Sequence, residues 1–149
     1  MKAARYLPTA ARILLGLVFF VFGLNGFLQF LPAPPMSGPP AAFAGALVAT
    51  GYMFPLIKGT EVIAGLLLLG NRFVALALAL LAPVVVNIVL FHTFLTPPNP
   101  IALGVLALEV YLAWAYRSAY RTMLAARVTP IAADESHTHE TSAPHVAAT

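Results

Sequence analysis

The chain has 149 residues, enough for one domain, and with 60% hydrophobic and only 9% charged residues it is far more apolar than a soluble domain, which points to a lipid bilayer. Because it has no cysteine, disulfides, thiolate zinc sites and iron–sulfur ligation are excluded, and any redox role must borrow a cofactor or a partner. The net charge of +3 does not indicate nucleic acid as a partner, since most basic residues flank apolar segments as topology determinants do, at Arg5, Arg12, Arg72, Arg117 and Arg121.

The first apolar run covers residues 13–31 and follows a basic N-terminus at residues 1–12. At about 1.5 Å per residue this run is long enough to cross the hydrocarbon, so we expect the first transmembrane helix here. A cleaved signal peptide is the alternative interpretation. Its apolar core would be shorter and would end in small residues, whereas this run ends in Leu31 and a proline-rich stretch.

Prolines and apolar runs divide the rest of the chain. Residues 32–52 are predicted to form an outer loop, because prolines lack the donor that a helix needs, with a short helix at 41–50 on or dipping into the membrane face. We expect further spans at 53–70, at 73–95 with a kink at Pro83, and, after a loop at 96–100, at 101–117. Residues 118–149 are predicted to be a tail, disordered from about residue 129.

The distribution of Lys and Arg predicts the orientation. Basic residues occur at the N-terminus, in the turn at Arg72 and after Tyr116, whereas both outer loops have none. Four spans with both termini in the cytoplasm satisfy this pattern. The sequence therefore predicts an all-α membrane four-helix bundle with one short extra helix. Two histidines of the tail, His137 and His139, lie near acidic residues, but this pattern is too weak to predict a metal site.

Several polar side chains lie inside the predicted spans. They are Asn25 and Gln29 in the first, Lys58 and Glu61 in the second, Asn87 and His92 in the third, and Glu109 in the fourth. Residue counts put most of them in the outer half of the bilayer or near its middle, which predicts one shared ligand or proton site. His92 fits less well, because it lies near the outer surface and about 140° around the helix from Asn87.

The charges in this set have an energetic consequence. A lone charged side chain at the centre of a span is unfavourable by roughly 2.5 to 3.5 kcal/mol, so each needs a partner. Lys58 can neutralise one carboxylate, and Arg117 is about 12 Å along the helix from Glu109. One glutamate should therefore be protonated or bind a ligand. The alternative, that the polar groups only hold the helices together, stays open, above all for Asn25, Gln29 and Asn87.

Four glycines are expected to serve close helix packing rather than a ligand: Gly16, Gly23, Gly59 and Gly65. Three stretches that contain them also carry a resemblance: Arg12-Ile-Leu-Leu-Gly-Leu-Val-Phe, Phe22-Gly-Leu-Asn25-Gly-Phe and Lys58-Gly-Thr-Glu61-Val-Ile-Ala-Gly65. Over residues 10–121 the chain resembles the DoxX family of small four-span membrane proteins. The resemblance implies a four-helix bundle in a bacterial cytoplasmic membrane, and the family takes its name from a subunit of a quinone-reducing thiosulfate oxidoreductase.

The function expected from these observations is that of a redox-linked membrane subunit with a quinone-type or proton-handling site. We expect an accessory protein or subunit, with a membrane or periplasmic redox partner, rather than a self-sufficient enzyme. Two alternatives remain. One is a protein that binds or transports a lipid or small amphiphile, with Lys58 on an anionic headgroup, and the other is a structural partner within a membrane complex.

Overall fold

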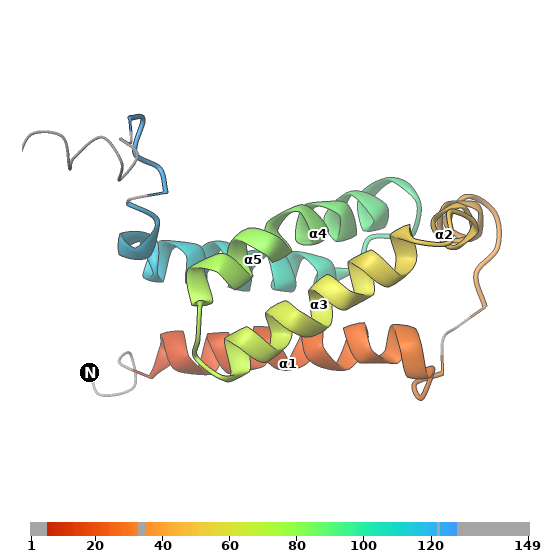
Figure 1. Ribbon diagram of the computed structural model, residues 1–149. Coiled ribbons are helices and arrows are strands. Elements are labelled where there is room, and N and C mark those ends of the chain that lie inside the picture. The colour runs from red at the N-terminus through yellow and green to blue at the C-terminus, as the bar shows by residue number, and fades with distance from the viewer. Residues whose placement is uncertain (1–5, 33–34, 122, 128–149) are drawn as a thin grey trace, which may run out of the picture. The chain divides into compact units, whose positions relative to one another are not determined.

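A computed structural model describes residues 6–32, 35–121 and 123–127, and these residues form helices and no strands. The helices are α1 (Leu7–Leu28), α2 (Pro39–Ala49), α3 (Met53–Leu69), α4 (Val74–Phe94), α5 (Pro100–Ala115) and the short 3-10 helix η2 (Arg117–Tyr120), as Figure 1 shows. The predicted all-α class is confirmed. The predicted disordered tail, with its histidines, lies outside the described residues.

The chain divides into two compact units, residues 1–119 and residues 120–149. All five α-helices belong to the first unit. In the second unit, the described residues hold the end of η2 and a few turns.

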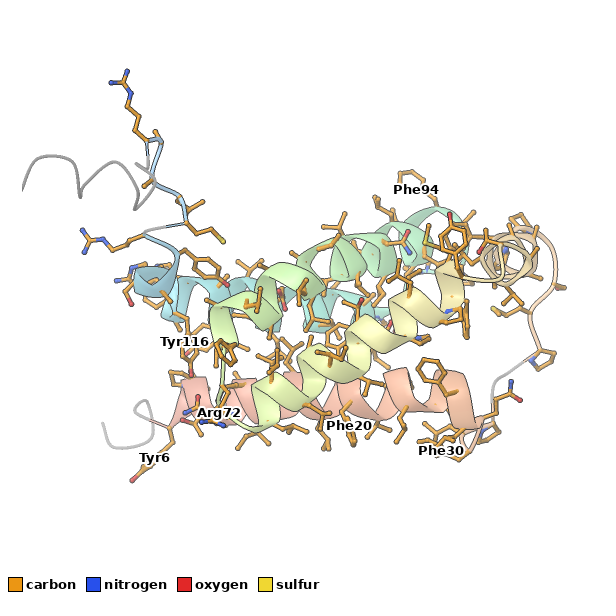
Figure 2. The ribbon with its side chains drawn as sticks, viewed as in Figure 1. Tyr6, Phe20, Phe30, Arg72, Phe94 and Tyr116 are labelled. Atoms are coloured by element: carbon orange, nitrogen blue, oxygen red, sulfur yellow. The ribbon has the colours of Figure 1, made fainter. Side chains whose placement is uncertain are left out.

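Four helices of the first unit pack in a closed ring, in which α1 contacts α3, α3 contacts α4, α4 contacts α5 and α5 contacts α1. Tyr6, Arg72 and Tyr116 lie at one end of this ring, and Phe30 and Phe94 lie at the other, called the Phe94 end below (Figure 2). Successive helices of the ring therefore run in alternate directions. Its centre is filled by large buried side chains: Leu15, Phe19, Leu68, Leu78, Leu81, Val85 and Leu112.

The outer surface of these helices suits lipid. Among the described residues, α1 and α4 are each long and apolar enough to cross a membrane. The helices α2 and α3 meet at an angle of 91°, and they would form a third span if the bent pair is counted as one. The helix α5 is also apolar but has only 16 residues. Many large hydrophobic side chains point outward, such as Leu14, which is 51% exposed, and Leu66, also 51% exposed. Two to three helices can thus cross a bilayer, as in a membrane protein.

The first helix differs from the expected segment 13–31 at both of its ends. It begins at Leu7, where Pro8 fits the first turn because that turn does not need its N–H group. It ends at Leu28, because Gln29 adopts a left-handed conformation with φ of 51°. Arg12, which we expected to flank the span, consequently lies inside the helix.

The remaining helices lie close to the expected segments. The helix α2 forms where a short helix was predicted at 41–50, and its Phe43 ring packs 5.7 Å from the Phe91 ring of α4, between centroids. The helices α3 and α4 lie within the predicted segments 53–70 and 73–95. The helix α5 starts at Pro100, because the Asn99 side chain accepts a hydrogen bond from the N–H of Ile101 at 2.9 Å and caps it.

The helices α1 and α3 approach each other so closely that a side chain larger than that of glycine would collide at several contact positions. A Cβ atom added to Gly65 of α3 would lie 2.6 Å from the backbone nitrogen of Phe20 in α1. Gly16 and Gly23 of α1 face the same contact, whereas Gly59 has nothing within 4 Å of such an atom. The packing role expected for the glycines is thus confirmed for three of the four and does not hold for Gly59.

Candidate ligand site between α1 and α3

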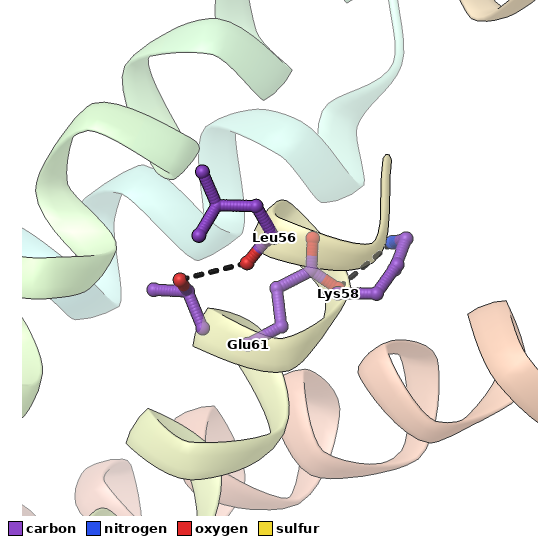
Figure 3. Close-up of polar contacts among 4 residues, drawn as sticks. Leu56, Lys58 and Glu61 are labelled. Atoms are coloured by element: carbon purple, nitrogen blue, oxygen red, sulfur yellow. Dashed lines mark hydrogen bonds and ion pairs between the residues drawn. The ribbon is translucent and has the colours of Figure 1, made fainter. Parts of the chain in front are cut away.

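Lys58 and Glu61 form an ion pair on one face of α3, with 2.8 Å between Lys58 Nζ and Glu61 Oε2 (Figure 3). The two residues are three apart, a spacing that places side chains on the same helix face. The Glu61 side chain is 5% exposed and the Lys58 side chain 21% exposed. The pair therefore has a buried carboxylate end and a more open ammonium end.

The ammonium end lies against α1. The aliphatic part of Lys58 crosses Gly26, where an added Cβ atom would lie 2.5 Å from the lysine carbons, while Gly23 makes room for Glu61 in the same way. The Lys58 ammonium also lies 6.0 Å from the centroid of the Phe54 ring, one turn earlier in α3. The small residues of α1 thus let the charged pair lie between the two helices.

A pocket of about 560 Å³ opens beside Lys58 at the Phe94 end. Its lining combines an ammonium group, two amide side chains and two aromatic rings, and it consists of Phe22, Asn25, Gly26, Gln29, Leu31, Pro32, Phe54 and Lys58. The Asn25 Oδ1 atom accepts a hydrogen bond from the N–H of Leu31 at 2.6 Å, which holds the chain after α1 in place. The donors of Lys58 and of the amides can bind carbonyl or phosphate oxygens, and the rings can stack on a flat group.

Four of the predicted site residues thus come together. Asn25, Gln29 and Lys58 line the pocket, and Glu61 is bound to Lys58. Gln29 contributes from the segment after α1 rather than from its interior face, because the helix has already ended there.

The other three predicted residues lie elsewhere. Glu109 of α5 is 6% exposed, its Oε2 atom has no hydrogen-bond partner within the described part of the chain, and it does not line this pocket. Asn87 is exposed and lies in a groove between α3 and α4. His92 is half-buried, with Nδ1 2.8 Å from the carbonyl oxygen of Ile88, and it lines a separate pocket of about 290 Å³ near Asn99. The structure thus brings together the predicted residues of α1 and α3 and places those of α4 and α5 apart from them.

Sequence reasoning missed the role of Arg12. This arginine is 6% exposed, and its Nη1 atom donates to the carbonyl oxygens of Leu68 and Leu69 in the last turn of α3. A cation is favourable there, because the carbonyls at the end of a helix carry partial negative charge. The signal that could have found it is Pro8, which marks a helix start well before Arg12.

Among the described residues, no group of three or more His, Asp or Glu side chains is placed to hold a metal ion. Comparison of the chain with protein-family models, with curated proteins and with solved structures finds no match. The chemistry of the site therefore has to be inferred from its own residues.

Proposed function

We propose that this chain is a four-span, DoxX-like protein of a bacterial cytoplasmic membrane, and that its Lys58 pocket binds the headgroup of a quinone-type amphiphile as a subunit of a redox system. The observation that carries the proposal is the Lys58–Glu61 pair at the wall of a pocket that also holds two amides and two aromatic rings. The three sequence stretches quoted above support the family.

Four spans are supported by the ring of contacts, in which α5 fills the same kind of position as the longer helices. At about 1.5 Å per residue α5 would extend about 24 Å, and it ends at aromatic and basic residues suited to a membrane surface. Trp114 is 63% exposed, and the Arg117 guanidinium lies 4.6 Å from its ring centroid. Because Arg72 lies at the same end as Tyr6 and Tyr116, we assign that end to the cytoplasm and the Phe94 end to the outer face.

The charge balance of the pocket favours a neutral headgroup. Lys58 is already neutralised by Glu61 at 2.8 Å, so an added anion would leave a net negative charge in a region of low dielectric. A quinone carbonyl instead accepts hydrogen bonds from the ammonium and the amides without adding charge. Its ring can stack on Phe22 or Phe54, and its apolar tail can follow the lipid-facing surface of α1.

A quinone takes up two electrons and two protons on reduction. In this proposal the electrons come from a partner protein, since the chain has no cysteine to hold an iron–sulfur or other thiolate-bound electron carrier. In this proposal Lys58 holds the quinone oxygen, and Glu61 passes the two protons to the quinone one after the other, taking each from water at the mouth of the pocket.

The test is native mass spectrometry of the detergent-purified protein, with organic extraction and an ultraviolet spectrum of the released molecules. The double variant Lys58→Met/Glu61→Gln removes both charges together and leaves neither buried alone. Asn87→Leu is the matched control. It removes an amide of α4 that lies in the groove between α3 and α4, outside the Lys58 pocket. We expect a quinone in the wild type and in the control, and none in the double variant.

Three results would contradict the proposal. A bound phospholipid without any quinone would favour the alternative of a lipid-binding protein. Equal quinone content in the wild type and the double variant would place the quinone outside the Lys58 pocket. A protein without any bound molecule would favour the structural role in a membrane complex.

A further inference from the structure

The helix α4 presents an amide group on its outward surface. Asn87 is exposed, and no hydrogen bond of its side chain is found among the described residues. The helix itself is apolar and long enough to cross a membrane. At about 1.5 Å per residue, Asn87 lies about 10 Å along the axis from the end of α4 at Phe94, within the hydrocarbon of a bilayer. An unpaired amide at this depth is unfavourable, because lipid tails offer no hydrogen bonds.

The surface around Asn87 is concave. It lines a groove of about 370 Å³ between α3 and α4, together with Leu56, Ile57, Thr60, Leu80, Pro83 and Val84. Thr60 donates its hydroxyl hydrogen to the carbonyl oxygen of Leu56 at 2.9 Å, which leaves the hydroxyl oxygen free to accept. Pro83 lacks an N–H group, so the carbonyl one turn earlier in α4 has no helical donor. The groove thus combines apolar walls with two polar side chains, Asn87 and Thr60, that can each accept a further hydrogen bond.

We propose that this groove is the docking surface for a second copy of the chain, held by a reciprocal hydrogen-bond pair between the two Asn87 amides. An amide carries both a donor and an acceptor, so two identical amides satisfy each other across a two-fold axis. Two copies inserted in the same direction are related by an axis along the membrane normal. Asn87 of one copy then lies at the same depth as Asn87 of the other without any further adjustment.

The lining favours a second copy over the other occupants. It contains no charged residue, so it does not suit an ionic headgroup. A transmembrane helix of another protein would need a polar group at the depth of Asn87, whereas a second copy supplies one by symmetry. The exposed Leu80, 40% accessible, and Leu56, 59% accessible, provide apolar contacts around the amide pair.

The absence of cysteine makes the chain suitable for a crosslinking test in reconstituted vesicles. Leu80→Cys places a thiol two helical turns from Asn87 on the same face of α4. Leu14→Cys is the matched control, because Leu14 is exposed on α1 and lies as many residues before the end of its helix as Leu80 before the end of α4. On mild oxidation we expect disulfide-linked dimers from Leu80→Cys and not from Leu14→Cys, since a disulfide forms only when the Cα atoms come within about 7 Å.

A second measurement tests the amide itself. The dimer fraction is determined by single-molecule photobleaching over a range of protein-to-lipid ratios for the wild type, Asn87→Leu and Asn87→Gln. We expect Asn87→Leu to weaken the dimer about tenfold, the effect of losing about one interhelical hydrogen-bond pair. Asn87→Gln keeps the amide and should recover part of that loss. Circular dichroism checks that each variant remains helical.

The proposal would be overturned by a wild type that stays monomeric at every ratio, or by Leu14→Cys dimers that form as readily as Leu80→Cys dimers. A crosslink from Leu80→Cys to a different protein in native membranes, with no homodimer, would also overturn it and would assign the groove to that partner. None of these results depends on the ligand in the Lys58 pocket.

Discussion

Two buried glutamates of this chain stand in different surroundings. Glu61 is bound to Lys58 at 2.8 Å, whereas the Oε2 atom of Glu109 has no hydrogen-bond partner among the described residues. An unpaired carboxylate is far more unfavourable than a neutral carboxyl group in an apolar interior. We therefore expect Glu109 to hold a proton in the folded protein and Glu61 to be ionised, so the two residues should respond differently to the loss of charge.

Glutamine has nearly the shape of a protonated glutamate and allows this difference to be measured. Glu109→Gln should change the free energy of unfolding by less than about 0.5 kcal/mol, because it replaces one neutral polar group with another. Glu61→Gln should lower it by about 1 to 2 kcal/mol, since it leaves the partly exposed Lys58 without its counter-charge. Unfolding in mixed micelles with increasing sodium dodecyl sulfate measures both. A larger loss for Glu109→Gln would show that Glu109 is ionised and paired.

At the scale of the helices, the contact between α1 and α3 places the Lys58 pocket. Gly65 brings the two backbones together at Phe20 of α1, and Gly23 and Gly26 leave room for Glu61 and Lys58. A substitution at Gly65 that separates α1 from α3 should therefore alter the pocket, even though Lys58 lies about two helical turns away. The effect on the fold can be measured independently of any ligand.

Two alanine substitutions in α3 separate packing from helix propensity. Gly65→Ala should destabilise the protein by about 1 to 3 kcal/mol, because the new methyl group would meet the backbone of Phe20. Gly59→Ala has open space and should be neutral or stabilising by up to about 1 kcal/mol, since alanine favours helix. The same detergent titration compares them. Equal effects of the two substitutions would contradict the close contact.

Some of these features can be predicted from the sequence and others cannot. Prolines and glycines interrupt the apolar runs clearly enough to locate the helices. The spacing of Lys58 and Glu61 predicts that both side chains lie on one face of their helix. The direction of Asn87 could not be predicted, because α4 is apolar on all sides and its sequence does not distinguish the packed face from the lipid face. The same ambiguity put Glu109 and Asn87 in one layer, although depth alone does not bring side chains together.

At the scale of the whole molecule, the number of membrane crossings decides which parts of the chain share a compartment. Among the described residues, two helices meet the length and hydropathy expected of a span, and a third results if α2 and α3 count as one. The proposed four spans place residues 37 and 118 on opposite sides of the membrane. With three spans these residues would lie on the same side.

Single cysteines at exposed serines can distinguish these arrangements, because the chain has no native thiol. Ser37→Cys, before α2, should react with a membrane-impermeant maleimide in intact spheroplasts. Ser118→Cys, after α5, should react only after permeabilisation, because an even number of crossings places both termini inside. Labelling of Ser118→Cys in intact spheroplasts would exclude the four-span arrangement.

The bond from Arg12 to the end of α3 has a consequence for how the protein enters the membrane during synthesis. The carbonyl groups of Leu68 and Leu69 that accept from Arg12 do not exist until the chain has been extended well past α1. Until then only water or headgroups can satisfy the guanidinium, so the early turns of α1 must stay near the membrane surface. We therefore expect the first helix to reach its final depth only when α3 arrives, and the two helices to complete their insertion as one hairpin.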